Sequence, residues 1–159
     1  MIIRPMQVSD LDRVLEIARS LPQAPRWARD VYEAALQPGS APQRVALVAE
    51  TDVSPEVAGF MVAAVVGPDA ELETIGVAES WQRRGVGRQL LRALARVLGG
   101  AGVSRLTLEV RALNAPAQRL YRSAGCEEVG RRASYYADPK EDAIVMAVEI
   151  TVGMVGDGL

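Results

Sequence analysis

The spacing of apolar residues changes along the chain, and each spacing predicts a type of element. Apolar residues three or four positions apart predict helices from about Ser9, Trp27, Gly85 and Asn114 onward. Short apolar runs and alternating patterns predict strands at 1–6, 44–50, 57–66, 71–77, 105–110, 126–132 and 143–150. The resulting order, β-α-α-β-β-β-α-β-α-β-β, indicates a mixed α/β fold.

Polar and turn-forming residues mark the ends of these elements. Ser9 and Asp12 are spaced as a capping box at the start of the first helix, with Asp in place of the usual Glu. Gly99–Gly100 is expected to end the third helix and Gly125 the fourth. Because the chain has 159 residues, we expect one domain over 1–150, followed by a short, frayed tail over 151–159.

Composition narrows the functional classes. A net charge of −2 argues against general binding to nucleic acid. No apolar run reaches the ~18 residues that cross a membrane, and the first residues lack the layout of a secretory signal. With one cysteine, Cys126, no internal disulfide can form, so we expect a cytoplasmic protein without membrane partners. The absence of histidine leaves a carboxylate, an amine or a relayed water as general base, and we expect no metal site.

The stretch SWQRRGVGRQLL, residues 80–91, places Gly85 and Gly87 between a predicted strand and a predicted helix. Glycine allows a ligand to approach the backbone, and the free N–H groups of a helix start attract anions such as phosphate. Taken alone, the stretch is more typical of a glycine turn before an arginine-rich, solvated helix. It lacks the Gly-Lys-Ser/Thr of a P-loop, and Leu90 stands where a dinucleotide-binding fold has its third glycine.

Three segments together resemble one enzyme family. QRRGVG at 82–87 resembles the Q/R-x-x-G-x-G/A acetyl-CoA signature of the GNAT acetyltransferases. LTLEVRALNAPAQRLYRSAG (106–125) and GRRASYYADPKEDAIVM (130–146) resemble motifs of one branch, the bacterial ribosomal-protein N-terminal alanine acetyltransferases. The resemblance is strong from about Leu72 to Met146 and weak before residue 70. The sequence departs from the family pattern at Thr74, Gly76, Leu113 and Cys126.

The resemblance implies the GNAT fold, a mixed and mostly antiparallel sheet flanked by helices. In this fold two central parallel strands, here 71–77 and 105–110, splay apart to hold the pantetheine arm of acetyl-CoA. The resemblance implies acetyl-CoA contacts from the first strand, from the glycine loop around the pyrophosphate, and from the start of the last helix. The implied residues are Ile75, Gly76, Val77, Gln82, Arg83, Arg84, Gly85, Val86, Gly87, Arg88 and Asn114. For Asn114 the alternative is a simple helix N-cap.

Glu109 is implied as the general base. It ends a strand on the face opposite Leu106, Leu108 and Val110. Without the motif, a solvated carboxylate paired with Arg111 would be the simpler interpretation. A carboxylate that acts through a water can serve an α-amine, because a group with a pKa near ~8 is about one-tenth neutral at pH 7. A lysine, with a pKa near ~10.4, has roughly a hundredfold less neutral amine.

Tyr121 is implied as the general acid. It follows Asn114 by about two helical turns, so both lie on nearly the same helical face. The phenol could protonate a leaving thiolate whose conjugate acid has a pKa near ~8.5. The alternative is an aromatic ring packed beside Leu120. Acyl transfer would be direct, because nothing in the sequence resembles a Ser–His or Cys–His nucleophile pair.

Tyr135 and Tyr136 lie in the segment that borders the acceptor site in this family. They would shape a peptide groove, or alternation along a strand would place one ring in the core and the other at the surface. Acidic residues gather in the same region, where they would favour a basic peptide or form a solvated surface. They are Glu127, Glu128, Asp138, Glu141 and Asp142.

These features predict transfer of an acetyl group from acetyl-CoA to a protein N-terminal amine, with the alanine of a small-subunit ribosomal protein as the expected acceptor. One alternative within the family is a small-molecule amine or a lysine side chain as acceptor. A second alternative, from another class, is a non-catalytic acyl-CoA-binding regulatory module. A nucleic-acid-binding module built on the arginines of the glycine loop and its helix is the least supported.

Overall fold

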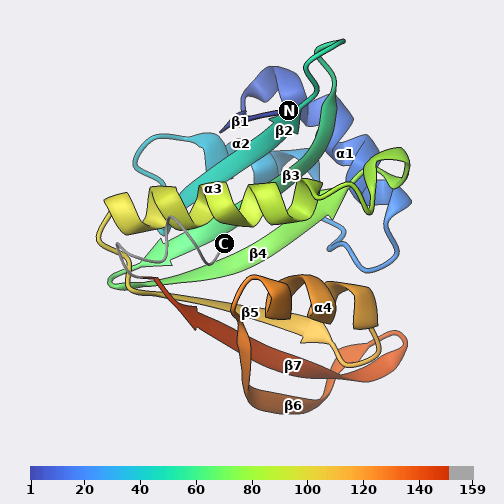
Figure 1. Cartoon of the computed structure of the whole chain (residues 1–159), viewed down its shortest axis with the longest axis vertical. Coiled ribbons are helices and arrows are strands. Elements are labelled where there is room, and N and C mark those ends of the chain that lie inside the picture. Colours follow the sequence, from blue (N-terminus) through green and yellow to red (C-terminus); the bar gives the residue numbers. More distant parts are fainter. Residues whose placement is uncertain (151–159) are drawn as a thin grey trace.

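Seven strands form one mixed sheet in the order β1-β2-β3-β4-β5-β7-β6 in the computed structural model, which describes residues 1–150 (Figure 1). The strands are β1 (Ile2–Pro5), β2 (Gln43–Glu50), β3 (Val57–Val66), β4 (Asp69–Val77), β5 (Arg105–Arg111), β6 (Glu127–Ala137) and β7 (Lys140–Glu149). The helices are α1 (Leu11–Ser20), α2 (Arg29–Leu36), α3 (Val86–Gly100) and α4 (Ala115–Ser123), with short 3-10 turns η1 (Val8–Asp10) and η2 (Glu79–Trp81). The predicted order of elements is confirmed, and the predicted frayed tail lies outside the described residues.

Helices cover both faces of the sheet. In Figure 1, α3 crosses in front of the strands and α1 and α2 lie behind them. Behind the sheet, α1 and α2 pack with Tyr32 and Phe60 in one apolar cluster. In front, α3 and α4 pack with Leu90, Leu94 and Tyr121 in a second cluster. Among the described residues, no helix is long and apolar enough to cross a membrane.

The two central parallel strands separate partway along their length. β4 and β5 pair only from Asp69 opposite Arg105 to Leu72 opposite Leu108, although both strands continue beyond these residues. The register between β3 and β4 shifts immediately after this point, where Val62 pairs with Thr74 but Ala63 pairs with Leu72. This shift leaves Glu73 as an extra residue in β4, and such a bulge bends the strand that contains it. The predicted splay of these strands is therefore confirmed.

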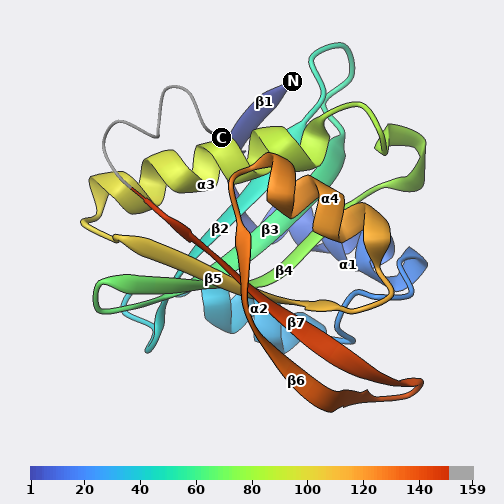
Figure 2. The same cartoon turned by 60° about the horizontal axis from the view of Figure 1, so that its bottom comes forward.

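The last hairpin is longer than the sequence pattern predicts. The predicted strands end at Arg132 and begin again at Ala143, but β6 and β7 continue to a turn at Asp138–Pro139. The pairing of the two strands is irregular in this added part. Arg132 pairs with Ala143 and Tyr136 pairs with Glu141, so three residues of β6 lie opposite the single residue Asp142. Figure 2 shows this hairpin extending away from the rest of the sheet.

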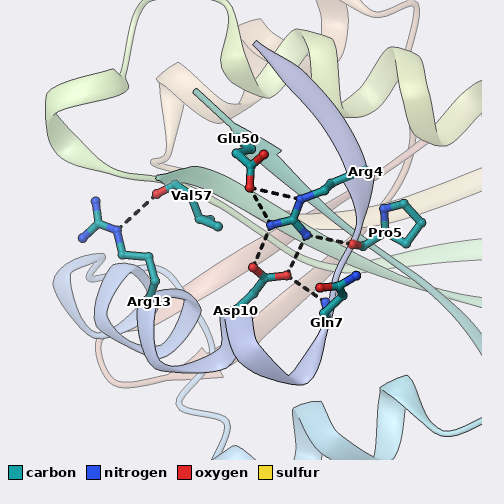
Figure 3. A network of polar contacts seen from close by, with 7 residues as sticks. All are labelled: Arg4, Pro5, Gln7, Asp10, Arg13, Glu50 and Val57. Carbon is teal, nitrogen blue, oxygen red and sulfur yellow. Dashed lines mark hydrogen bonds and ion pairs between the residues drawn. The ribbon is translucent and has the colours of Figure 1, made fainter. Parts of the chain in front are cut away.

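The start of the first helix is also held differently from the prediction. Ser9 lies inside the 3-10 turn η1, and the carboxylate that reaches back to cap the turn belongs to Asp10, which accepts the N–H of Gln7 at 2.8 Å. Arg4 donates to both oxygens of Asp10 at 2.9 Å and to Glu50 at 2.8 Å (Figure 3). This arginine ties β1, η1 and β2 together, and its hydrogen bonds to Asp10 lower the pKa of that carboxyl. The capping box predicted from Ser9 and Asp12 is therefore wrong.

Candidate active site

A groove of about 730 Å³ opens where β4 and β5 separate. It is lined by the splayed ends of the two strands, the start of α3, one side of α4 and the loop that follows α1. Most of the predicted site residues line it: Ile75, Gly76, Val77, Gln82, Arg83, Gly85, Val86, Gly87, Arg88, Glu109, Asn114, Tyr121 and Tyr136. Two predicted residues, Arg84 and Tyr135, are not among the lining residues.

The start of α3 presents backbone donors to the groove. Gly85 is the N-cap, with φ +80°, and the non-glycine residue Arg83 also has a positive φ of 62°. The first intrahelical hydrogen bond is donated by Gln89 to the carbonyl oxygen of Gly85 at 3.0 Å. The N–H groups of residues 86–88 precede this bond and point toward the N-terminal end of the helix, where the helix dipole is positive. This geometry suits an anion.

Side chains around the glycine loop have separate roles. Arg83 and Arg88 line the groove, whereas the guanidinium of Arg84 lies 5.0 Å from the ring of Trp81 and stacks on it. The side-chain amide of Gln82 donates to the carbonyl oxygen of Val77 at 3.0 Å. Gln82 therefore braces the loop against the end of β4, and Arg84 packs on Trp81, a residue that itself lines the groove.

Two of the departures from the family pattern, Thr74 and Gly76, are two residues apart in β4. A Cβ atom on Gly76 would lie 2.7 Å from the ring of Phe60 and 2.9 Å from a methyl carbon of Leu21, so these apolar groups fill the space of a larger residue. Thr74 is one of the groove-lining residues, but its hydroxyl is buried and has no hydrogen-bond partner. Of the two, Thr74 leaves a buried polar group without a partner in the strand that borders the site.

The caps of α4 fix the position of Tyr121. The side-chain oxygen of Asn114 accepts the N–H of Ala117 at 3.2 Å, so Asn114 is an N-cap that also lines the groove. At the other end Gly125 has φ +93°, and the N–H of Cys126 bonds the carbonyl oxygen of Tyr121 at 3.0 Å. Together with the bond from Gly125 to Arg122, this is a Schellman motif.

Tyr121 is a buried residue whose side chain reaches the groove. Burial, followed by the proximity of Cys126 and Tyr136, raises the pKa of its phenol well above the ordinary value. The phenol therefore stays protonated throughout the physiological pH range. Cys126 is also buried, and burial raises the pKa of its thiol to about 11.

Glu109 contacts the edge strand β6. Its carboxylate lies 3.1 Å from Nε of Arg132, and hydrogen bonding to Glu109 raises the pKa of the Tyr135 phenol. The alternative pairing with Arg111 is wrong, because the Arg111 guanidinium lies 4.1 Å from the ring of Tyr136 and 3.4 Å from Glu141. The leucines and valine on the other face of β5 are buried, as predicted: Leu106, Leu108 and Val110.

Neither interpretation of the two adjacent tyrosines holds in full. Tyr136 is half-buried and lines the groove, while Tyr135 is 50% exposed and reaches Glu109 rather than the core. Two of the acidic residues nearby brace the backbone: Glu141 accepts the N–H of Leu113 at 2.7 Å, and Asp142 accepts the N–H of Ser134 at 2.8 Å. Glu141 therefore holds the loop before α4, and Asp142 holds the irregular part of β6.

Sequence reasoning missed several groove residues. The segment LPQAP (21–25), for which the sequence predicts no role, contributes Leu21, Gln23, Ala24 and Pro25 to the lining. Arg132, which contacts Glu109 without lining the groove, also has no predicted role. The signal that could have identified the loop is its apolar and proline content directly after an amphipathic helix; Arg132 has no such local signal.

Comparison with known proteins agrees with this geometry. The model of the Acetyltransferase (GNAT) family matches residues 11–126. The ribosomal protein bS18-alanine N-acetyltransferase of Escherichia coli (strain K12) is 44% identical over 99 residues, which cover 61% of this chain and 67% of that protein. The crystal structure of the Escherichia coli ribosomal-protein-S18-alanine N-acetyltransferase superposes with a TM-score of 0.82 at 33% identity, covering 99% of this chain and 97% of the other.

A eukaryotic protein has the same fold. Arabidopsis thaliana NAA60, solved in complex with acetyl-CoA, matches with a TM-score of 0.83 at 24% identity over 94% of this chain and 99% of its own. The family suggested by the three sequence motifs is thus confirmed by the family model and by relatives of the same branch. The chain belongs to the GNAT family of acetyltransferases.

Proposed function

We propose that this enzyme transfers the acetyl group of acetyl-CoA to the N-terminal amine of a protein, with the N-terminal alanine of ribosomal protein bS18 as the acceptor. The observation that carries the proposal is that Glu109, Tyr121 and the start of α3 line one continuous groove. A base, an acid and an anion site are the groups that such a transfer needs. The names of the relatives support the choice of acceptor.

The splayed strands and α3 would bind acetyl-CoA. The N–H groups of residues 86–88, with Arg83 and Arg88, would bind the pyrophosphate, because they combine backbone donors with positive charge at a helix start. The edge of β4 beyond Leu72 has lost its pairing with β5 and would bind the pantetheine amides. This placement brings the thioester toward Glu109 and Tyr121.

Glu109 would act on the acceptor amine. An α-ammonium group must lose a proton before its nitrogen can attack, and Glu109 would take that proton directly or through one water. The new bond joins this nitrogen to the acetyl carbon, and the carbon–sulfur bond breaks. The nitrogen, which still carries two hydrogens after the attack, loses one of them to water as the amide forms, and this release balances the proton that the sulfur gains. An α-amine, with a pKa near ~8, gives up its proton more readily than a lysine near ~10.4, so a single carboxylate serves an N-terminus better.

Tyr121 would act on the leaving sulfur. The electron pair of the broken carbon–sulfur bond leaves with sulfur, and the Tyr121 hydroxyl would donate a hydrogen bond and then a proton to it. A phenol is already protonated at neutral pH, and burial raises the pKa of Tyr121 further, so the hydroxyl would be available as a donor. The role of Tyr121 is thus to stabilise negative charge that develops during the reaction.

The test is incubation with acetyl-CoA and a peptide that carries the first residues of bS18 with its N-terminal alanine. Mass spectrometry with fragmentation is expected to place one acetyl group on the α-amine, and the same peptide with a formylated N-terminus is expected to stay unmodified. Equal labelling of the blocked peptide would assign the activity to lysine. Binding of acetyl-CoA without turnover of any amine would identify a non-catalytic module.

A further inference from the structure

The carboxylate assigned as the base is already in contact with a cation. Nε of Arg132 lies 3.1 Å from Oε1 of Glu109, although β7 separates their strands in the sheet. The Arg132 guanidinium also lies 5.3 Å from the ring of Tyr135, a residue near enough to Glu109 that this carboxylate raises the pKa of its phenol. Two side chains of β6 thus meet the group that an acceptor amine must reach.

The irregular register of β6 makes this double contact possible. In a regular strand, residues three apart point to opposite faces, so Arg132 and Tyr135 would not meet the same partner. Here residues 133–135 bulge opposite Asp142, and Ser134 has a positive φ of 52°. The bond from the Ser134 N–H to Asp142 holds the bulge at 2.8 Å. The backbone distortion therefore aims both side chains at Glu109.

The surroundings of Glu109 are rich in negative charge. The pKa of Glu71 in β4 is raised, first by burial and then by repulsion from the carboxylates of Glu109 and Glu73. Glu73 has its own cation, since Arg44 lies 2.8 Å from it and both side chains are only about one-fifth exposed, at 22% and 21%. Arg132 is the cation next to Glu109 and also favours the charged form of Glu71. This end of the groove therefore attracts cations.

The ion pair between Arg132 and Glu109 costs little free energy to break. The Arg132 side chain is 59% exposed, while that of Glu109 is 19% exposed. Exposed ion pairs of this kind contribute little free energy, because water can replace either partner. The Arg132 side chain can therefore swing into solvent at small cost and leave the Glu109 carboxylate in place.

We propose that Arg132 occupies, in the empty enzyme, the place of the acceptor's ammonium group on Glu109, and that the arriving N-terminus displaces it. This inference rests on the proposed function. An ammonium that gives its proton to Glu109 must come within hydrogen-bond reach of that carboxylate, and two cations on one carboxylate repel each other. Arg132 therefore competes with the acceptor and selects for N-termini that bind strongly enough to replace it.

The experiment compares Arg132→Ala with Arg131→Ala in steady-state kinetics with the bS18 peptide. Arg131 is the matched control, because it is the neighbouring arginine on the same strand, is exposed to a similar degree, and faces Glu128 and Asp142 instead of Glu109. In Arg132→Ala the KM for the peptide is expected to fall about three- to fivefold, the range for loss of one exposed pair. Arg131→Ala and Arg132→Lys are expected to keep the wild-type KM.

Other outcomes contradict the inference. A fall in kcat of tenfold or more in Arg132→Ala, restored in Arg132→Lys, would make Arg132 a positioning residue for the base rather than a competitor. An equal change in both alanine variants would assign the effect to the charge of β6 as a whole. If the wild-type enzyme acetylates the peptide and the KM does not fall, only this inference fails; if it acetylates no N-terminus, the proposed function fails as well.

Discussion

Leu72 and Leu108 are the last residues that β4 and β5 pair with each other, and both line the groove. Beyond this pair the strands diverge, although β4 continues to Val77 and β5 to Arg111. The two leucines therefore mark the point from which the groove opens. The facing edges of the strands beyond them are available to a ligand instead of to each other.

Acetyl-CoA is expected to slow amide exchange at 75–77 and 83–88, because backbone groups in both segments would gain partners on binding. Hydrogen–deuterium exchange with mass spectrometry, with and without acetyl-CoA, measures this directly. Residues 143–149 of β7, which pair with β5 on its other edge, serve as the internal control and are expected to exchange at an unchanged rate. Equal exchange in all three segments would contradict this placement of acetyl-CoA.

Glu109→Gln and Tyr121→Phe are each expected to lower kcat about 100-fold, within the range for loss of a general base or acid. Both changes nearly preserve side-chain shape, so the Kd for acetyl-CoA, measured by calorimetry, is expected to change by less than about twofold. Comparable losses of acetyl-CoA affinity would move these residues from the chemical step to cofactor binding. Wild-type turnover in both variants would contradict the assignments.

Gly87→Val is expected to weaken acetyl-CoA binding about tenfold or more, whereas Arg84→Ala is expected to weaken it less than about threefold. Gly87 lies at the start of α3, and a Cβ atom added to it would lie only 3.0 Å from a methyl carbon of Leu120 in α4. Arg84 is not among the lining residues, and its guanidinium instead stacks on Trp81, which is. Calorimetry measures the Kd of each variant for acetyl-CoA, and thermal melts check that each variant is folded. A larger loss of affinity in Arg84→Ala than in Gly87→Val would make side-chain charge the main source of affinity.

Features set by neighbours in the sequence were predictable. The bounds of β3 at Val57 and Val66 match the apolar run, and the end of α4 follows from Gly125, whose positive φ suits glycine. The splay of the parallel strands was predictable only through the family resemblance. No local sequence pattern indicates that the pairing of β4 with β5 stops at Leu72.

Features set by residues far apart in the sequence were not predictable. Asp10 caps the first turn because Arg4 and Gln7 fix its carboxylate, which no spacing rule specifies. The bulge of β6 depends on Asp142 of the neighbouring strand, so the predicted strand stopped too early. Likewise, the partner of Glu109 lies 23 residues later in sequence, at Arg132, and only the sheet brings the two together.

Thr74→Val is expected to stabilise the fold by about 1 kcal/mol, because it removes a buried hydroxyl that has no hydrogen-bond partner and keeps the branched shape. For a chain of this size that corresponds to a rise of about 2–4 °C in Tm. Differential scanning calorimetry without ligand provides the measurement. A lower Tm in the variant would show that the hydroxyl is satisfied in solution.

Asp10→Asn is expected to destabilise the fold by about 3 kcal/mol at pH 7, because it removes the charge of a buried carboxylate that Arg4 binds through both oxygens. Since Arg4 lowers the pKa of Asp10 in the folded state, this contribution is fully present above the unfolded pKa, near ~3.9. It is lost as the pH falls through the lower folded value, where wild type and variant become alike. Urea unfolding at several pH values from neutral to strongly acidic measures the difference.

Asp12→Asn is the matched control for this prediction. Asp12 pairs with Arg29, but its side chain is 93% exposed, so its replacement is expected to leave the unfolding midpoint nearly unchanged at every pH. A gap between wild type and Asp10→Asn that stays constant from neutral to strongly acidic pH would contradict the assignment. Such a gap would trace the loss of stability to the altered cap geometry instead of the charge, because protonation of Asp10 would then have no effect on it.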